Sequence, residues 1–81
     1  MQITIEFHGV LERLAGAASM SLIVADGAVV ADALELLTQK APNLVDTVER
    51  SACAIGDSLV SRSDSLSHGA RLALLPPVAG G

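Results

Sequence analysis

The chain is poor in the residues that build disulfides, nucleic-acid interfaces and membrane spans. Among its 81 residues it has one cysteine, one phenylalanine and no tryptophan or tyrosine. A single cysteine excludes an internal disulfide and is typical of a reducing compartment, so we expect a cytoplasmic protein. Nine acidic residues against five Lys and Arg give a net charge of −4, which phosphate backbones would repel. No apolar run approaches the roughly 20 residues that span a bilayer, and the chain shows no signal-peptide pattern. We therefore expect neither a nucleic-acid nor a membrane partner.

Hydrophobic residues are abundant, at 51%, and charged residues make up 17%. This balance excludes a disordered chain. The length allows one small domain, whose core must consist of Ile, Leu, Val and Ala because aromatic residues are nearly absent. Such a domain leaves little room for an enclosed substrate pocket of ~300 Å³. We therefore predict a carrier or binding module without an autonomous active site.

The apolar pattern predicts an α+β fold. Strict alternation over residues 2–7 predicts a first strand. An apolar stripe at helical spacing over 29–41 predicts the main helix, and Pro42 ends it. Shorter patterns predict a helix closed by Gly16, one more helical piece at 44–48, and strands at 20–24, 52–55, 59–60 and 71–75. The simplest packing of these parts is a mixed sheet of about five strands on one main helix.

The C-terminal segment is the most informative part of the sequence. Pro76 and Pro77 have no backbone N–H, so the last strand must stop before them. This divides the chain into a domain at 1–75 and an extended tail at 76–81. Beyond the prolines the side chains shrink, through Val78, Ala79, Gly80 and Gly81. The tail is thus a thin, uncharged probe that carries one functional group, the carboxylate of Gly81.

A C-terminal carboxylate becomes reactive when ATP adenylates it. Glycine lacks a Cβ, so Gly80 and Gly81 can pass through a narrow channel to the nucleotide of an activating enzyme. A sulfur nucleophile can then attack the activated acyl group and leave a thiocarboxylate on Gly81, which can donate its sulfur. In this scheme the chain binds no permanent cofactor, since the activating enzyme uses the ATP.

The whole chain resembles the MoaD-type sulfur carriers, the small subunits of molybdopterin synthase. The resemblance rests on the chain length, the strand that ends at Phe7, the turn at Leu66 to Gly69 before the last strand, and the Pro-Pro-Val-Ala-Gly-Gly end. It implies a β-grasp, ubiquitin-like fold. The chain departs from the family in having Leu75 where an aromatic residue is common, and His68-Gly69-Ala70 where Asp-Gly-Asp is common.

The resemblance also implies partners. An E1-like adenylyltransferase would activate Gly81, and a cysteine desulfurase or a rhodanese-type donor would supply the sulfur. The tail would then enter the large subunit of molybdopterin synthase, in a heterotetramer, and give its sulfur to a cyclic pyranopterin precursor. The family's hydrophobic docking patch matches Phe7, Leu59 and Leu75. Strand alternation agrees for Leu75, but it places Phe7 with Ile3 and Ile5 in the core.

Three side chains outside the tail suggest chemistry. Cys53 is the sole thiol, and we predict that it is a buried core residue. His8 and His68 have no cysteine or carboxylate at metal-binding spacing, so we predict no metal site and place His68 in a turn.

Other functions remain open from the sequence. The same tail would suit a sulfur carrier for cysteine, thiamine or another sulfur-containing metabolite. It would also suit a ubiquitin-like modifier, although Lys40 is the only lysine and makes polymeric chains a poor expectation. A plain interaction domain with a passive end is the fourth possibility, and it predicts that removal of Gly80 and Gly81 has no effect.

Overall fold

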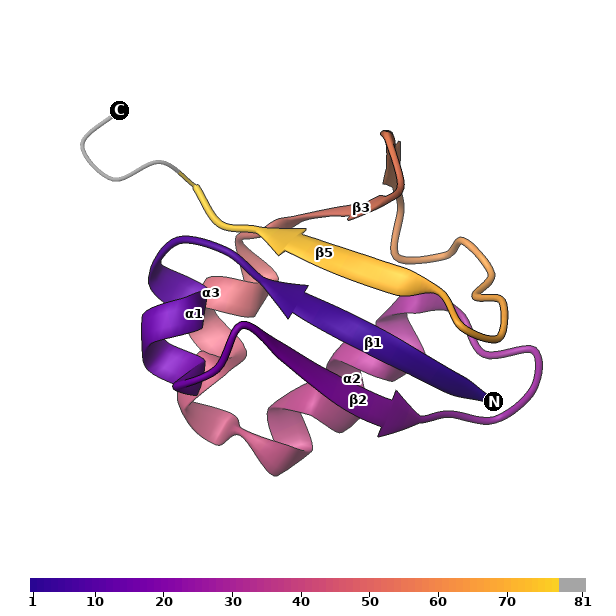
Figure 1. Ribbon diagram of the computed structural model, residues 1–81, viewed down its shortest axis with the longest axis horizontal. Coiled ribbons are helices and arrows are strands. Elements are labelled where there is room, and N and C mark those ends of the chain that lie inside the picture. The colour runs from indigo at the N-terminus through magenta and orange to yellow at the C-terminus, as the bar shows by residue number, and fades with distance from the viewer. Residues whose placement is uncertain (78–81) are drawn as a thin grey trace.

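A mixed five-stranded sheet carries three α-helices on one of its faces in the computed structural model, which describes residues 1–77 (Figure 1). The elements are β1 (Gln2–Phe7), α1 (Val10–Ala15), β2 (Ser19–Ile23), α2 (Val30–Lys40), the 3₁₀ turn η1 (Pro42–Leu44), α3 (Val45–Glu49), β3 (Ala52–Ile55), β4 (Ser58–Val60) and β5 (Arg71–Leu75). The predicted order of strands and helices is confirmed, with α2 as the main helix.

The two central strands run parallel, and this places the C-terminal exit. The sheet order is β2-β1-β5-β3-β4; β1 pairs with β5 in parallel, and the other pairs are antiparallel. Phe7, the last residue of β1, is in register with Leu74 of β5. Parallel neighbours leave a sheet at the same edge. The loop from β1 to α1 and the segment after β5 therefore lie side by side (Figure 1).

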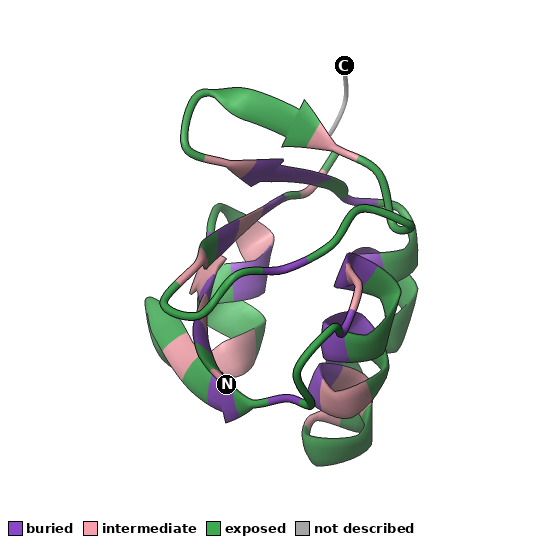
Figure 2. Ribbon diagram, turned by 90° about the vertical axis from the view of Figure 1, so that its right-hand side faces the viewer, coloured by how far each residue is buried: buried purple, intermediate pink, exposed green. Residues whose placement is uncertain are grey.

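The core lies between the sheet and the helices, and strand alternation accounts for it. In Figure 2 buried segments of the strands and of the helices face one another. Each buried aliphatic side chain contributes about 1.5–3 kcal/mol to folding. The largest side chains that are almost completely buried are Ile3, Ile5, Leu11, Leu22, Leu37, Leu44, Leu72 and Leu74.

The helix boundaries follow the predicted signals. Gly16 adopts a left-handed conformation, with φ of 70°, and its N–H donates to the carbonyl of Glu12 to close α1. At the start of α2 the N–H of Val29 donates to the Asp32 carboxylate at 2.9 Å, where an acidic residue also favours the helix dipole. Pro42 follows the last turn of α2 and begins η1.

The loop after β4 is exposed over residues 61–65, and it also makes structural contacts. It holds the neighbouring helices together through Arg62. The guanidinium Nη2 donates to the carbonyl of Val48 at 2.9 Å and to that of Ser51 at 3.1 Å. The Arg62 carbonyl accepts from the N–H of Ala31, in the first turn of α2, at 2.9 Å. Arg62 thus satisfies backbone groups at the ends of two helices.

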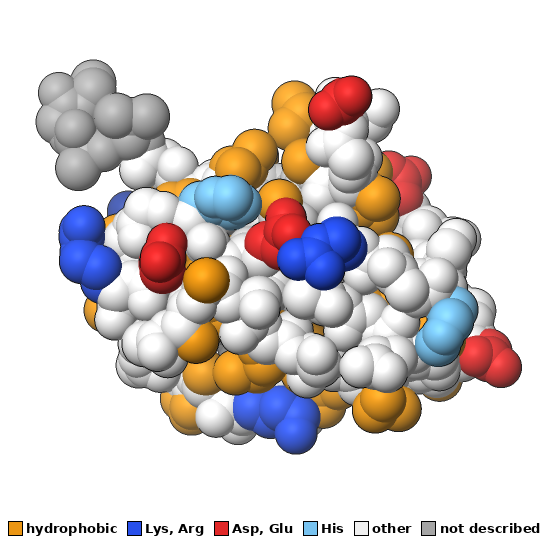
Figure 3. Space-filling view, viewed as in Figure 1, with side chains coloured by type: hydrophobic (Ala, Val, Ile, Leu, Met, Phe, Trp, Pro, Cys, Tyr) orange, Lys and Arg blue, Asp and Glu red, His pale blue; other side chains and the backbone are white. Residues whose placement is uncertain are grey.

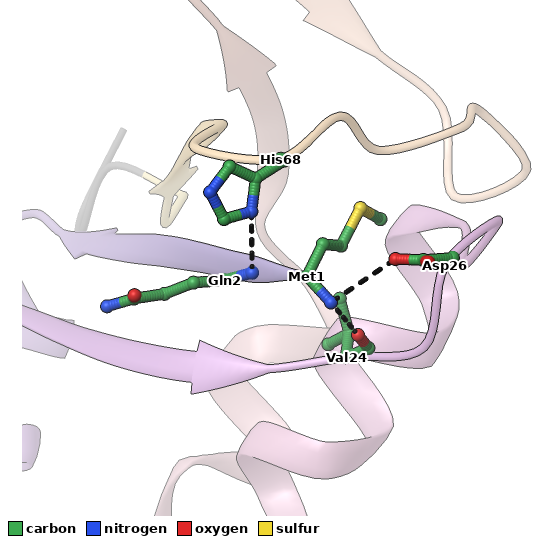
Figure 4. Close-up of polar contacts among 5 residues, drawn as sticks. All are labelled: Met1, Gln2, Val24, Asp26 and His68. Atoms are coloured by element: carbon green, nitrogen blue, oxygen red, sulfur yellow. Dashed lines mark hydrogen bonds and ion pairs between the residues drawn. The ribbon is translucent and has the colours of Figure 1, made fainter.

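His68 lies in the turn before β5, as predicted, and it also ties that turn to the sheet. Its Nδ1 accepts a hydrogen bond from the N–H of Gln2 at 3.1 Å (Figure 4). Beside this contact the amine of Met1 donates to the carbonyl of Val24 at 2.6 Å, and it lies 3.4 Å from the Asp26 carboxylate. These contacts anchor the edge of the sheet opposite to the C-terminal exit (Figures 1 and 4).

Candidate functional site

The C-terminal exit starts where β5 ends, at Leu75. Pro76 is half-buried and Pro77 is exposed. Neither proline can donate to a strand ladder, so β5 ends at Leu75 as the sequence predicts, where it still pairs with β3; its pairing with β1 ends at Leu74. The remaining tail residues that the sequence singles out, Val78, Ala79, Gly80 and Gly81, lie outside the described residues. Their roles stay predictions, and the site described below is the surface that surrounds their point of attachment.

A hollow of about 410 Å³ opens at the root of this tail. Its walls come from the loop between β1 and α1, from α1 itself and from the end of β5. They combine apolar groups with one guanidinium and one imidazole; the lining residues are His8, Gly9, Val10, Arg13, Leu75, Pro76 and Pro77. His8, which sequence reasoning left without a role, thus lies beside the first tail residues.

An apolar patch covers the outer face of the sheet next to the exit. Leu59 is 73% exposed and Leu75 is 38% exposed. Register places Ala54 opposite both Leu59 and Ala73, and it places Ala52 opposite Leu75. Because residues paired across strands share a face, these five side chains form one surface. We call this group of Ala52, Ala54, Leu59, Ala73 and Leu75 the outer patch. Figure 3 shows hydrophobic side chains gathered over this part of the sheet.

The outer patch is larger than the sequence indicates. Leu59 and Leu75 are brought together as the resemblance implies, but the three alanines between them are not singled out by sequence reasoning. Alternation in β3 and β5 assigns each alanine to one face of its own strand. Only the register between the strands shows that the three alanines adjoin one another and Leu59. Ala54 is only 9% exposed, so the accessible part of the patch comes mainly from Leu59, Leu75 and Ala52. An exposed apolar surface of this kind is typical of a protein–protein contact.

A charged pair borders the outer patch on β1 and β5. The Nε of Arg71 donates to the carboxylate of Glu6 at 2.7 Å, and both side chains project from the outer face. Glu6 is in register with Ala73, so the pair directly adjoins the patch. An apolar centre with a polar border is the usual anatomy of an interface between two proteins.

Phe7 does not belong to this surface. It is 2% exposed and packs in the core with Ile3 and Ile5, as strand alternation predicts. The resemblance implies a docking role for Phe7, but the aromatic ring has no exposed surface with which to contact a partner. Successive side chains of a strand point to opposite faces of the sheet. Glu6 projects from the outer face, so Phe7 points into the core. The outer patch therefore consists of Leu59, Leu75 and the alanines, without Phe7.

Cys53 is a core residue, as predicted. It is 2% exposed and pairs in register with Leu74. Burial raises the pKa of the Cys53 thiol above its ordinary value of 9.0, and the charge of Arg62 acts in the opposite direction but less strongly. A thiol that stays protonated in an apolar environment is a poor nucleophile. The geometry gives Cys53 a packing role.

No group of three or more His, Cys, Asp and Glu side chains within residues 1–77 is arranged to hold a metal ion. None of the helices there is long and apolar enough to cross a membrane.

The chain is similar to known proteins in both sequence and structure. The model of the ThiS family matches residues 5–81, whereas no curated protein gives a significant match. SAMP1 from Haloferax volcanii has a TM-score of 0.91 at 25% identity, with all of both chains covered. A putative molybdopterin converting factor subunit 1 from Pyrococcus furiosus has a TM-score of 0.86 at 20% identity, with 96% of this chain and 99% of that chain covered.

A third similar structure is a complex. It contains subunits 1 and 2 of the molybdopterin-converting factor from Helicobacter pylori, with a TM-score of 0.72 at 24% identity and full coverage of both chains. These likenesses confirm the predicted β-grasp fold, because the sheet order and the helix placement superpose over the whole chain.

Proposed function

Because the chain belongs to the ThiS family of ubiquitin-like sulfur carriers, we propose that Gly81 carries sulfur as a thiocarboxylate and donates it to a pyranopterin precursor. In this proposal the chain is the small subunit of molybdopterin synthase and works in the cytoplasm, where ATP and reduced sulfur are available. The observation that supports it best is the position of the outer patch, which lies at the sheet edge from which the Pro76-Pro77 tail departs.

Two chemical steps load the carrier. A carboxylate oxygen of Gly81 attacks the α-phosphorus of ATP on an E1-like adenylyltransferase, and pyrophosphate leaves. In the second step the terminal sulfur of a persulfide on a cysteine desulfurase or rhodanese-type donor attacks the acyl carbon and AMP leaves; a thiol then reduces the resulting acyl disulfide, which releases the thiocarboxylate and leaves a disulfide between that thiol and the donor cysteine. A C–S bond has replaced a C–O bond, with no change in the oxidation state of that carbon. The group is ionised at neutral pH and nucleophilic.

Delivery requires a partner that surrounds the tail. The outer patch gives such a partner an apolar surface to grip, while the Glu6–Arg71 pair at its border supplies fixed charges that orient it. The large subunit of molybdopterin synthase would bind the patch and receive the tail in its active site. There the thiocarboxylate sulfur attacks an electrophilic carbon of the precursor, and water cleaves the acyl C–S bond to restore the carboxylate.

A second candidate function is attachment to other proteins. The high similarity to SAMP1, whose family name is small archaeal modifier protein 1, favours it. The same adenylate would then be attacked by a lysine amine instead of sulfur and would form an isopeptide bond. Lys40 is exposed at the end of α2 and is the only lysine that another copy could use as an acceptor.

One reconstitution separates the two functions. The chain, ATP, an E1-like enzyme and a sulfur donor are mixed first, and then the large synthase subunit and the cyclic pyranopterin precursor are added. Appearance of the dithiolene product supports the molybdopterin role. Thiocarboxylate without this product supports a carrier for another pathway. Lysine-linked adducts that resist reducing agents support the modifier, and a Lys40→Arg variant reports whether adducts between copies use that residue.

A further inference from the structure

The loop between β1 and α1 brings a glycine against the first tail proline. A Cβ built on Gly9 would lie 3.4 Å from Cγ of Pro76. Four other glycines in residues 1–77 have positive φ angles, namely Gly16, Gly27, Gly56 and Gly69, and a Cβ on any of these would meet nothing within 4 Å. Among these five glycines Gly9 is the one whose built Cβ would reach van der Waals contact with another segment, the Pro76 ring.

The backbone at Gly9 has a conformation that side chains oppose. Its φ is 55° and its ψ is −130°, a combination that L-residues with a Cβ rarely adopt. The loop is held on both sides: the N–H of Phe7 donates to the carbonyl of Ala18, and the carbonyls of His8 and Gly9 accept from the first turn of α1. Gly9 thus presents bare backbone at a fixed position beside the end of β5.

We propose that Gly9 is a positioning residue, and that the loop at His8 and Gly9 is a seat for the Pro76 ring that sets the direction of the tail. The parallel pairing of β1 with β5 brings the two segments together, with Phe7 in register with Leu74. Pro76 is half-buried against this loop whereas Pro77 is exposed, so the contact ends at Pro76. The pyrrolidine ring fixes φ of Pro76, and the seat fixes where that ring lies.

This inference rests on the proposed function, because direction matters only if Gly81 must reach a reacting atom. A seat at the tail root limits the directions that the tail can take before a partner binds. Placement of a reacting group dominates the chemical step, whereas docking through the outer patch determines the affinity. Loss of the seat should therefore lower kcat for adenylation and leave KM nearly unchanged.

The test compares two matched pairs of variants in the full-length chain. Gly9→Ala puts a Cβ against the Pro76 ring at a positive φ, and Gly27→Ala puts a Cβ at a positive φ in a turn with open space around it. Pro76→Ala removes the ring from the seat, and its control Pro42→Ala removes an exposed proline ring at the start of η1, outside the exit. Pyrophosphate release with an E1-like enzyme gives kcat and KM. We expect Gly9→Ala and Pro76→Ala to lower kcat about tenfold, because a displacement near 1 Å can cost about a hundredfold. Both controls should stay within about twofold in kcat and KM.

Each outcome decides the question. Wild-type kcat in both Gly9→Ala and Pro76→Ala overturns the inference, and so does an equal loss in the two control variants. If Gly9→Ala fails to fold, as shown by thermal unfolding, the Pro76→Ala and Pro42→Ala pair carries the test with the loop intact. Nuclear Overhauser contacts between Gly9 Hα and the Pro76 ring probe the seat in the free protein; their absence overturns it even when adenylation proceeds. Failure of the wild-type chain to be adenylated at all, with those contacts present, refutes the proposed function instead.

Discussion

Replacement of Leu59 by serine tests whether the outer patch binds a partner. Leu59 is 73% exposed, so its removal creates no cavity in the core. Burying a whole leucine side chain contributes about 1.5–3 kcal/mol. Roughly three quarters of that area is available to a partner, which corresponds to about 1–2 kcal/mol of binding free energy. We expect Leu59→Ser to weaken binding to the large synthase subunit by about 5- to 30-fold.

The chain provides a matched control for this prediction. Ile23 is 70% exposed and projects from the same outer face, on the opposite edge strand β2. Ile23→Ser removes a side chain of the same composition and the same exposure, but far from the tail in the strand order. We expect it to leave the dissociation constant within about twofold, since exposed substitutions rarely change energies by more than about 0.5 kcal/mol.

Isothermal titration calorimetry with both variants and the wild-type chain measures the effect. Thermal unfolding checks that both variants keep the fold, and each should keep its free energy of unfolding within about 0.5 kcal/mol of the wild type. Equal weakening by the two substitutions would mean that exposed aliphatic groups contribute without regard to position. Unchanged affinity in Leu59→Ser would refute the assignment of the outer patch as the docking surface.

The remaining predictions concern two residues, Cys53 and Arg62. Burial raises the pKa of Cys53, so its thiol should react with iodoacetamide at neutral pH much more slowly in the folded chain than in denaturant, and Cys53→Ser should still accept sulfur at Gly81. The folded state favours the protonated thiol, so this contribution to stability is present below pH 9.0 and is lost as the pH rises above it. Cys53→Ala should lack that part of the pH dependence. Equal slopes of the unfolding free energy against pH in Cys53→Ala and the wild-type chain would contradict the assignment. Arg62→Ala should lower the free energy of unfolding by about 1–3 kcal/mol, because carbonyls of Val48 and Ser51 lose charged donors. Urea unfolding of Arg62→Ala beside Arg50→Ala, whose side chain bonds only within its own exposed turn, checks this; an equal loss in both would remove the special role of Arg62.

Much of the fold is predictable because the core is built from simple periodic patterns. Alternation in β1 and β5 assigns Ile3, Ile5, Leu72 and Leu74 to the core, and the structure agrees. Local signals such as Gly16 also mark helix ends correctly. These predictions succeed because the determining interactions lie within a few residues of one another in sequence.

The features that sequence reasoning misses depend on which strands are neighbours. The alanines of the outer patch join Leu59 only through the register of β3 with β4 and β5. The contact between Gly9 and Pro76 requires β1 to run parallel to β5. The bonds of Arg62 cannot be predicted either, because its acceptors are carbonyls at helix ends, which leave no trace in the side-chain pattern.

Phe7 shows how the two kinds of evidence differ. Resemblance places it on a docking surface, whereas its parity on β1 places it inside, and the structure follows parity. A resemblance to relatives assigns a residue its place along the chain. The face of the sheet that its side chain occupies depends instead on the alternation and register of the strand.

The central claim is that the terminal carboxyl group of Gly81 is the working part of the molecule. Intact-mass spectrometry after incubation with ATP, an E1-like enzyme and a sulfur donor tests it most directly, with a Gly81→Leu variant beside the wild-type chain. The account predicts ATP-dependent exchange of one oxygen for sulfur on the wild-type C-terminus and none on Gly81→Leu, because the larger side chain cannot pass to the nucleotide. Absence of the exchange in the wild-type chain, or equal exchange in Gly81→Leu, would contradict it.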